Sequence, residues 1–418
     1  MKKLYFILFL GCLTTNIFSQ QIPLNLSEFP FIDLSKNKLE IYNSSIYFER
    51  FYNKLDTFLI ENKGKINILH IGASHVQGGF LTNQIRRNFD LLNGDNKTSR
   101  GFIFPYKVAK TNNPKNFEVC FTGEWTSERN VGRSCSMPLG LAGIAVSTSD
   151  SAASISIKLN TDSVERRRTF TKLVLIGQTD EPQTVIPVIY TNGKEFLPCF
   201  FDAKTNAYIY ELHEYADTFK LAFMRSDSSK QSFTVYGFIP ENDTQGIVYH
   251  EVGVNGATVS SYLNCENFER ELALIKPDMV IFGIGINDWV GNNMTEREFI
   301  ANYMQLIERI RGVSPDCALV FITNNDSFKK IRLRRRRTSY AVNTNGLHAQ
   351  NAFRELARQN NGALWDQFAI MGGLRSMKQW ERAGLAAKDK IHFTKKGYEI
   401  LGNLLFEAMI EQQLTISN

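Results

Sequence analysis

The sequence is poor in cysteine and histidine, which argues against a zinc protein or a disulfide-built scaffold. Its 418 residues include 6 cysteines and 6 histidines. The cysteines that follow the first twenty residues are Cys120, Cys135, Cys199, Cys265 and Cys317. Their wide spacing fits no zinc motif, and an odd number cannot pair completely. We expect isolated, mostly buried thiols with at most one disulfide among the first three, and we predict no metal site and no cofactor.

Long hydrophobic runs are also lacking, with one exception at the N-terminus. Lys2 and Lys3 precede an apolar run from Leu4 to Leu13, and small or polar residues follow. This pattern is typical of a secretory signal peptide and is too short to span a bilayer. We therefore predict a signal peptide over residues 1–20 and an exported chain, periplasmic or extracellular, with no transmembrane segment. Cys12 follows Gly11, but Phe9 stands where a lipoprotein signal prefers leucine, so a lipid anchor is not expected.

An excess of positive over negative charge is lacking outside one segment. The net charge is +6, and seven positive residues lie in KKIRLRRRR at 329–337. Without this segment the chain would be slightly acidic, so we expect no nucleic-acid-binding surface. The segment fits a solvated loop, or alternatively a basic lip that attracts an anionic polymer.

Alternating apolar strands and amphipathic helices are present in two parts of the chain, which predicts an α/β fold with a parallel sheet. The expected strands are 66–71, Gly246–Val252, Pro277–Gly283, Ala318–Thr323 and Ala363–Asp366. The expected helices are Tyr47–Glu61, Phe80–Leu92, a helix ending near Ile275, Thr295–Arg311, Gly346–Asn360 and Lys395–Gln413. Residues 21–45 are expected to be irregular.

Between these two parts the pattern changes to short β-like runs. They are Phe117–Phe121, Ala153–Leu159, Lys172–Leu175, Thr184–Tyr190, Thr218–Met224 and Ser232–Ile239. Several strands at such spacing favour a β-sandwich. We predict an inserted all-β sandwich domain over residues 115–238, and a discontinuous catalytic domain formed by residues 21–114 and 239–418.

The stretch INILHIGASHVQGG (66–79) carries the first candidate for chemistry. An apolar run leads into Gly72, Ala73 and Ser74, and a helical pattern follows. A strand, a tight turn, a serine and a helix place a hydroxyl at the carboxyl end of a central strand, as α/β hydrolytic scaffolds do. The less specific alternative is that Ser74 only caps a helix.

Polar or glycine residues follow two further strands. Gly256 comes after the second strand and Asn287 after the third. Ligands of open parallel sheets bind outside the carboxyl ends of the strands, so we expect these residues to lie near Ser74. Asp389 and His392 lie three positions apart before the last helix, a spacing that lets a carboxylate hold one imidazole nitrogen while the other faces a serine. The alternatives are simple turn residues at Asn287 and a structural cap at His392.

Four blocks resemble the SGNH (GDSL-type) ester hydrolases: GASH at 72–75, VNGA around Gly256, GIND at 285–288 and DKIH at 389–392. The resemblance implies a flavodoxin-like three-layer sheet. It also implies that Ser74 is the nucleophile, His392 the general base and Asp389 its orienting partner. The oxyanion hole would comprise the N–H groups of Ser74 and Gly256 and the side-chain amide of Asn287.

The chain is especially similar to exported bacterial members that remove O-acetyl groups from peptidoglycan or other glycans. Some of these carry an inserted β-sandwich resembling a carbohydrate-binding module, and RGFIFPY at 100–106 fits their layout. The resemblance implies an exported serine esterase acting on small acyl esters of a polysaccharide. The alternatives are an acyltransferase with the same triad, or a glycan-binding protein that has lost activity. Ala73 favours the last, because the family usually has aspartate there.

The other histidines and two tryptophans are weaker candidates. His75 is expected to pack in the nucleophile loop and not to act as a second base. Trp289 and Trp380 fit either a sugar-binding cleft or the core. The remaining histidines show no partner pattern, and we expect them to be structural: His70, His213, His250 and His348.

Overall fold

The computed structural model describes residues 26–133, 135–161, 167–180, 184–226, 231–291, 294–332 and 338–416. The predicted signal peptide (1–20) lies outside the described residues, as do the four consecutive arginines of the basic segment. Within the described part, no helix has the length and apolar character needed to cross a membrane.

A six-stranded sheet forms the centre of the α/β part, in the order β1-β19-β16-β15-β2-β14. Its strands are β1 (Leu39–Ile41), β2 (Lys65–Gly72), β14 (Gly246–Gly253), β15 (Met279–Gly283), β16 (Ala318–Ile322) and β19 (Ala363–Trp365). The last five are parallel to their neighbours, and only β1 pairs antiparallel, with β19. Numbered along the chain, the five parallel strands follow the order 2-1-3-4-5 of flavodoxin-like sheets. The antiparallel edge strand β1 was not predicted, because a strand of three residues is too short to show an alternation of apolar and polar side chains.

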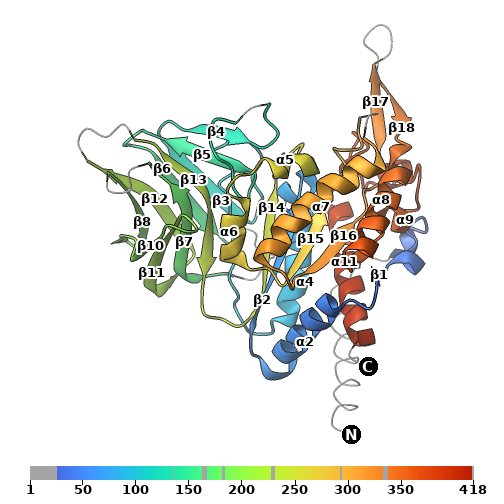
Figure 1. Cartoon of the computed structure of the whole chain (residues 1–418), viewed down its shortest axis with the longest axis horizontal. Coiled ribbons are helices and arrows are strands. Elements are labelled where there is room, and N and C mark those ends of the chain that lie inside the picture. The colour runs from blue at the N-terminus through green and yellow to red at the C-terminus, as the bar shows by residue number, and fades with distance from the viewer. Residues whose placement is uncertain are drawn as a thin grey trace.

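Helices cover both faces of this sheet (Figure 1). One buried cluster joins Ile66 and Ile68 of β2 to α2 (Ile46–Glu61), α4 (Phe80–Leu92) and α11 (Lys395–Ile416). The other cluster contains Leu69 and Ile71 of β2. Its helices are α5 (Val259–Leu263), α6 (Phe268–Ile275), α7 (Glu296–Val313) and α8 (Asn345–Gln359). Alternate residues of each strand therefore serve opposite layers, and the architecture has three layers. The predicted helices agree with these within a few residues, except that the one expected to end near Ile275 is two separate helices, α5 and α6.

Two antiparallel sheets lie between α4 and β14 in the sequence and to one side of the α/β part (Figure 1). Their orders are β10-β11-β7-β13-β5-β4 and β3-β6-β12-β8-β9. Every β-like run expected in this region lies on a strand, whereas β4, β5, β9, β10 and β11 were missed. β5 is buried along its whole length, so its sequence lacks the alternation that marks a half-exposed strand. The strands are β3 (Phe117–Thr122), β4 (Thr126–Arg129), β5 (Ile144–Thr148), β6 (Ser154–Leu159), β7 (Phe170–Gln178), β8 (Val185–Thr191), β9 (Lys194–Phe196), β10 (Phe200–Asp202), β11 (Ala207–Ala216), β12 (Thr218–Arg225) and β13 (Phe233–Glu241).

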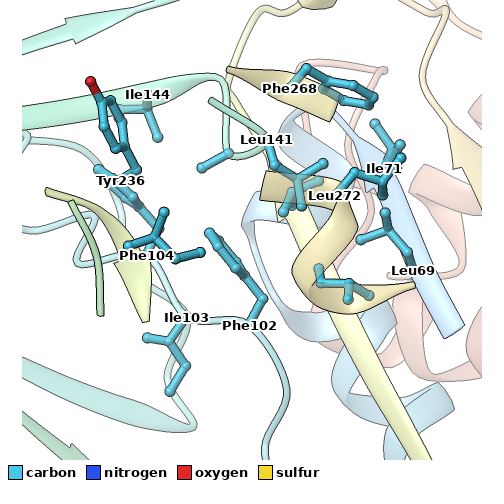
Figure 2. Packing of buried hydrophobic residues seen from close by; sticks show 14 of the residues in the cluster. Leu69, Ile71, Phe102, Ile103, Phe104, Leu141, Ile144, Tyr236, Phe268 and Leu272 are labelled. Atoms are coloured by element: carbon cyan, nitrogen blue, oxygen red, sulfur yellow. The ribbon is translucent and has the colours of Figure 1, made fainter. Parts of the chain in front are cut away.

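The β-rich region shares a hydrophobic core with the central sheet. The loop 100–106 supplies Phe102 and Phe104, each 1% exposed. Figure 2 shows Phe102 between side chains of the β-rich region and Leu69 and Leu272 of the α/β part. These contacts tie the two regions together by apolar burial.

Buried ion pairs add to this junction. The Arg100 guanidinium lies 2.5 Å from the Glu251 carboxylate of β14, and Arg168 lies 2.5 Å from Asp90 of α4. All four residues are almost fully buried. Removing one partner of such a buried pair typically costs about 3–5 kcal/mol.

A two-stranded hairpin extends from the body after β16 (Figure 1). Its strands, β17 (Phe328–Arg332) and β18 (Thr338–Val342), pair antiparallel. The expectation of a solvated loop over 329–337 was therefore wrong for residues 329–332, where Lys329, Lys330 and Arg332 lie on a strand.

The described cysteines are all free thiols. Cys120, Cys135 and Cys199 are exposed, and only Cys265 and Cys317 are buried. The expectation of mostly buried thiols was thus wrong for the three in the β-rich region.

Candidate active site

Ser74 begins a short helix directly after the central strand β2. The helix, α3 (Ser74–Gln77), follows Ala73, whose backbone angles are φ −117° and ψ −134°. A Cβ atom on Gly72 would overlap the Val76 side chain and lie 3.0 Å from the Gly283 carbonyl oxygen. Glycine is therefore needed at position 72 for α3 to turn back so closely on the sheet. This turn holds the half-buried Ser74 at the point where the strand order reverses, between β2 and its neighbours β14 and β15.

Asp389 and His392, the two polar residues before α11, lie in line with Ser74. Ser74 Oγ is 2.8 Å from His392 Nε2, and His392 Nδ1 is 2.7 Å from Asp389 Oδ2. The chain thus brings together residues 318 positions apart into a hydroxyl–imidazole–carboxylate line. This arrangement lets the imidazole accept the serine proton while the carboxylate fixes the ring tautomer.

The Asp389 carboxylate is held by its own loop. Its Oδ1 accepts hydrogen bonds from the backbone N–H groups of Ile391 (2.9 Å) and His392 (3.0 Å). Partial burial alone would raise the pKa of Asp389, but the N–H and ring of His392 and the N–H of Ile391 outweigh it and lower this pKa. The carboxylate is therefore ionised at neutral pH, as the orienting partner of a catalytic imidazole must be.

Two residues outside the predicted blocks fix this loop. The Asn325 side-chain amide donates to the Ile391 carbonyl at 3.0 Å, and the Phe328 N–H donates to the Lys390 carbonyl at 3.1 Å. Asn325 is only 3% exposed. Asn325 belongs to the loop after β16. A polar residue at the carboxyl end of a parallel strand was the signal in the sequence that could have identified it.

Asn287 follows β15, the strand that pairs with β2. Its Nδ2 donates to the Ala257 carbonyl at 2.9 Å. A carboxamide has two N–H donors, so one remains for a ligand. The neighbouring Asp288 accepts the Val259 N–H at 3.2 Å, and burial raises its pKa to about 7. The GIND block therefore holds the loop of residues 257–259 from one side.

Gly256 lies directly before Ala257, in the loop between β14 and α5, and has φ +85°, a conformation that favours glycine. A Cβ there would meet no heavy atom within 4 Å, so conformation and not space selects glycine. Gln77 and Asn255, which sequence reasoning did not single out, connect the loop to α3. The Gln77 Oε1 accepts the Asn255 N–H at 2.7 Å. In the sequence, the available signal was a glutamine three positions after the serine.

A hollow of about 560 Å³ opens beside Asn287. Thr258, Ser260, Met294 and Glu298 are among its lining residues. It is large enough for a small ligand, and it adjoins the loop that contains Gly256.

The two tryptophans considered for a sugar cleft are in the core instead. Trp289 is 2% exposed and Trp380 is 0% exposed. His75 is paired through Nδ1 with the Tyr398 hydroxyl at 2.7 Å, in keeping with a packing residue. Among the described residues, no group of three or more His, Cys, Asp or Glu side chains could hold a metal ion.

A serine–histidine–aspartate line at the carboxyl end of a flavodoxin-like sheet is the arrangement that serine hydrolases use. Residues 226–400 match the model of the GDSL-like Lipase/Acylhydrolase family. This range includes Gly256, Asn287, Asp389 and His392, and Ser74 lies before it. The matched part of the chain, which is less than half of it, is similar to the ester hydrolases of this family, whose GDSL-type motifs the sequence resembles.

A solved structure shares this fold over nearly the whole chain. A peptidoglycan O-acetylesterase superposes with a TM-score of 0.70 at 22% sequence identity, covering 90% of this chain and 99% of that one. A lipase/acylhydrolase from Enterococcus faecalis is 22% identical, with a TM-score of 0.30, over 40% of this chain and 78% of that one. The esterase EstA from Pseudoalteromonas sp. is 14% identical, with a TM-score of 0.30, over 40% of this chain and 79% of that one. Comparison with curated protein sequences gives no significant match.

Proposed function

We propose that the protein is an exported serine esterase that removes acetyl or similar small acyl groups from a glycan, with peptidoglycan as the leading candidate. The observation that carries this proposal is the unbroken line from Ser74 Oγ through His392 to Asp389. Export rests on the N-terminal pattern at residues 1–20.

In the proposed mechanism, Ser74 Oγ attacks the ester carbonyl carbon as its proton passes to His392 Nε2. Negative charge develops on the carbonyl oxygen, and the donors for it are the N–H groups of Ser74 and Gly256 and the free N–H of Asn287. His392 then gives its proton to the sugar oxygen as the ester C–O bond breaks, which leaves an acyl-serine. A water molecule then attacks the acyl carbon as its proton passes to His392. His392 returns this proton to Ser74 Oγ as the acyl–serine bond breaks, which releases the carboxylic acid and restores the free serine.

The glycan part of the proposal rests on two observations. The peptidoglycan O-acetylesterase matches nearly the whole chain, including the β-rich region. That region also has a hollow of about 700 Å³ lined in part by Trp125, Phe121, Glu124 and Asp150. Aromatic rings beside carboxylates are a composition suited to sugars, because rings pack on C–H faces and carboxylates accept from hydroxyls. We propose residues 115–238 as a carbohydrate-binding insert.

The test is acetate release by the purified protein from O-acetylated peptidoglycan, with p-nitrophenyl acetate as a small reporter. Free acetate from both substrates, lost in Ser74→Ala, would support the esterase. Acetylated oligosaccharide in place of free acetate would instead indicate an acyltransferase. Retention on glycan with no turnover of either ester would indicate a binding protein and overturn the proposal.

A further inference from the structure

Gln77 is a buried side chain whose hydrogen bonds join three separate segments. It lies one turn after Ser74 on α3 and is 2% exposed. Its Oε1 accepts the Asn255 N–H at 2.7 Å. Its Nε2 donates to the Thr111 hydroxyl at 3.0 Å and to the Asn112 carbonyl at 2.9 Å. Both ends of the amide therefore have partners.

The residue that Gln77 holds directly precedes Gly256. The side chain of Asn255 also donates to the Thr111 hydroxyl at 3.3 Å and to the Asn112 side-chain oxygen. Beyond Gly256, the Ala257 N–H donates to the Val254 carbonyl at 2.9 Å, and Asn287 binds the Ala257 carbonyl. No heavy atom lies within 4 Å of where a Cβ of Gly256 would be. The position of Gly256 is therefore set by the hydrogen bonds of Asn255 and Ala257 on either side of it.

We propose that Gln77 is a positioning residue that sets the Gly256 N–H relative to Ser74. This inference rests on the proposed esterase function. Because α3 carries both the nucleophile and the side chain that anchors Asn255, the backbone donors at Ser74 and Gly256 keep one geometry. Preorganised donors stabilise a developing oxyanion only when they already point at it, and a displacement of about 1 Å can cost about a hundredfold in rate.

The alternative is that Gln77 only satisfies buried polar groups and supports folding. Gln413 provides a matched control for this role. It is also 2% exposed, and its Nε2 donates to Asp56 Oδ1 at 2.6 Å near the end of α11, on an element distant in sequence from α3. Methionine has nearly the shape of glutamine but makes neither hydrogen bond, so the same change can be made at both positions.

The experiment compares Gln77→Met and Gln413→Met in the full purified chain with p-nitrophenyl acetate. We expect Gln77→Met to lower kcat by about 10- to 100-fold with little change in KM. A small alkylboronic acid forms a tetrahedral anionic adduct on serine. Its inhibition constant should rise by a similar factor, because its binding becomes weaker. Gln413→Met should leave kcat and boronate binding unchanged, whatever it does to Tm.

A wild-type kcat in Gln77→Met, or a loss of kcat without weaker boronate binding, would overturn the positioning role. Either result would leave the esterase assignment intact, because that depends on hydrolysis by the wild type and its loss in Ser74→Ala.

The second variant, Gln77→Glu, keeps the assay informative if the methionine variant does not fold. Its carboxylate can accept the Asn255 N–H but cannot donate to Asn112. Once protonated, the new carboxyl regains one donor. The ratio of its kcat to that of the wild type should therefore rise as the pH falls from 8 to 5. A ratio that stays constant across this range would contradict the proposal.

Discussion

The imidazole rings of His75 and His392 lie 5.1 Å apart between centroids, with their planes tilted by 44°, and it is the His392 ring that hydrogen-bonds to the Ser74 hydroxyl. His75 instead bonds the Tyr398 hydroxyl, and its other ring nitrogen is buried. Burial, together with the neighbouring His392, lowers the pKa of His75 to about 3. His75 is therefore neutral near neutral pH, and its uncharged ring lies beside that of His392.

This difference predicts unequal effects of substitution at the two histidines. His392→Ala should lower kcat by about three orders of magnitude or more, because the serine loses its base. His75→Phe keeps the ring packing and should cost less than about tenfold, since the bond that it loses is the neutral one to Tyr398. Hydrolysis of p-nitrophenyl acetate measures both. A loss in His75→Phe as large as in His392→Ala would show that His75 takes part in proton transfer.

Asn287→Ala tests the side-chain donor of the oxyanion hole. We expect kcat to fall by about a hundredfold to a thousandfold with little change in KM, because the amide bonds best to the developing oxyanion. The variant also removes the bond to Ala257, so Tm must be measured alongside the kinetics. An effect confined to KM would mean that Asn287 binds the ground-state substrate.

Buried neutral histidines predict a loss of stability in acid. His70 is fully buried, its Nδ1 is 2.7 Å from the Tyr249 hydroxyl, and burial lowers its pKa to about 3, opposed in part by Glu251. The unfolded chain protonates this residue below about pH 6.5 while the folded chain does not. Stability from the neutral ring is thus present above pH 6.5 and is lost as the pH falls towards 3.

His70→Asn isolates this contribution, because other groups titrate alike in variant and wild type. The free energy of unfolding of the variant relative to the wild type should rise by up to about 1.4 kcal/mol per pH unit below 6.5. Chemical denaturation between pH 4.5 and 7.5 gives this difference. The control is the exposed His213, whose φ of +58° asparagine tolerates. A His70→Asn difference as independent of pH as that of His213→Asn would contradict the prediction.

Ala73 tests whether the departure from the family pattern is disabling. Ala73 is 1% exposed, and the Tyr262 and Tyr106 hydroxyls bind the Gly72 and Gly253 carbonyls nearby, each at 3.0 Å. An aspartate there would place a carboxyl in a packed site, away from the proton path. We expect Ala73→Asp to lower Tm and to change kcat/KM by less than about a hundredfold, or roughly 3 kcal/mol. Strong activity gained from an inactive wild type would favour the binding-protein alternative.

Trp125→Ala tests the insert more cleanly than its deletion. Deletion would expose Phe102 and unpair Asp90 from Arg168, so it should impair the catalytic domain as well. Trp125→Ala should raise KM for O-acetylated peptidoglycan and leave p-nitrophenyl acetate hydrolysis unchanged. Tyr215→Ala, at a 66% exposed aromatic outside the hollow, is the matched control. Equal effects of both variants on the polymer would argue against a sugar site at Trp125.

Local pattern was enough to predict the strands and helices around the site. The apolar run before Gly72 predicts a buried strand, and the carboxyl ends of parallel strands share one edge of the sheet. Ser74 and Asn287 could therefore be expected to lie near each other from the sequence alone. The i, i+3 spacing of Asp389 and His392 likewise determined which carboxylate could hold which imidazole.

Only the tertiary structure decided which side chains face the site and which are buried. Gln77 and Asn255 are 178 positions apart, and no periodicity in the sequence indicates a contact between a short helix and a distant loop. Trp289 and Trp380 were as compatible with a cleft as with the core, because burial depends on what packs above a residue. The β-rich region reads as a separate unit in sequence, yet it shares a core with β2 through Phe102. Hydrophobic burial depends only on the apolar surface that is covered, so a local pattern marks a residue as buried but does not say which part of the chain will cover it.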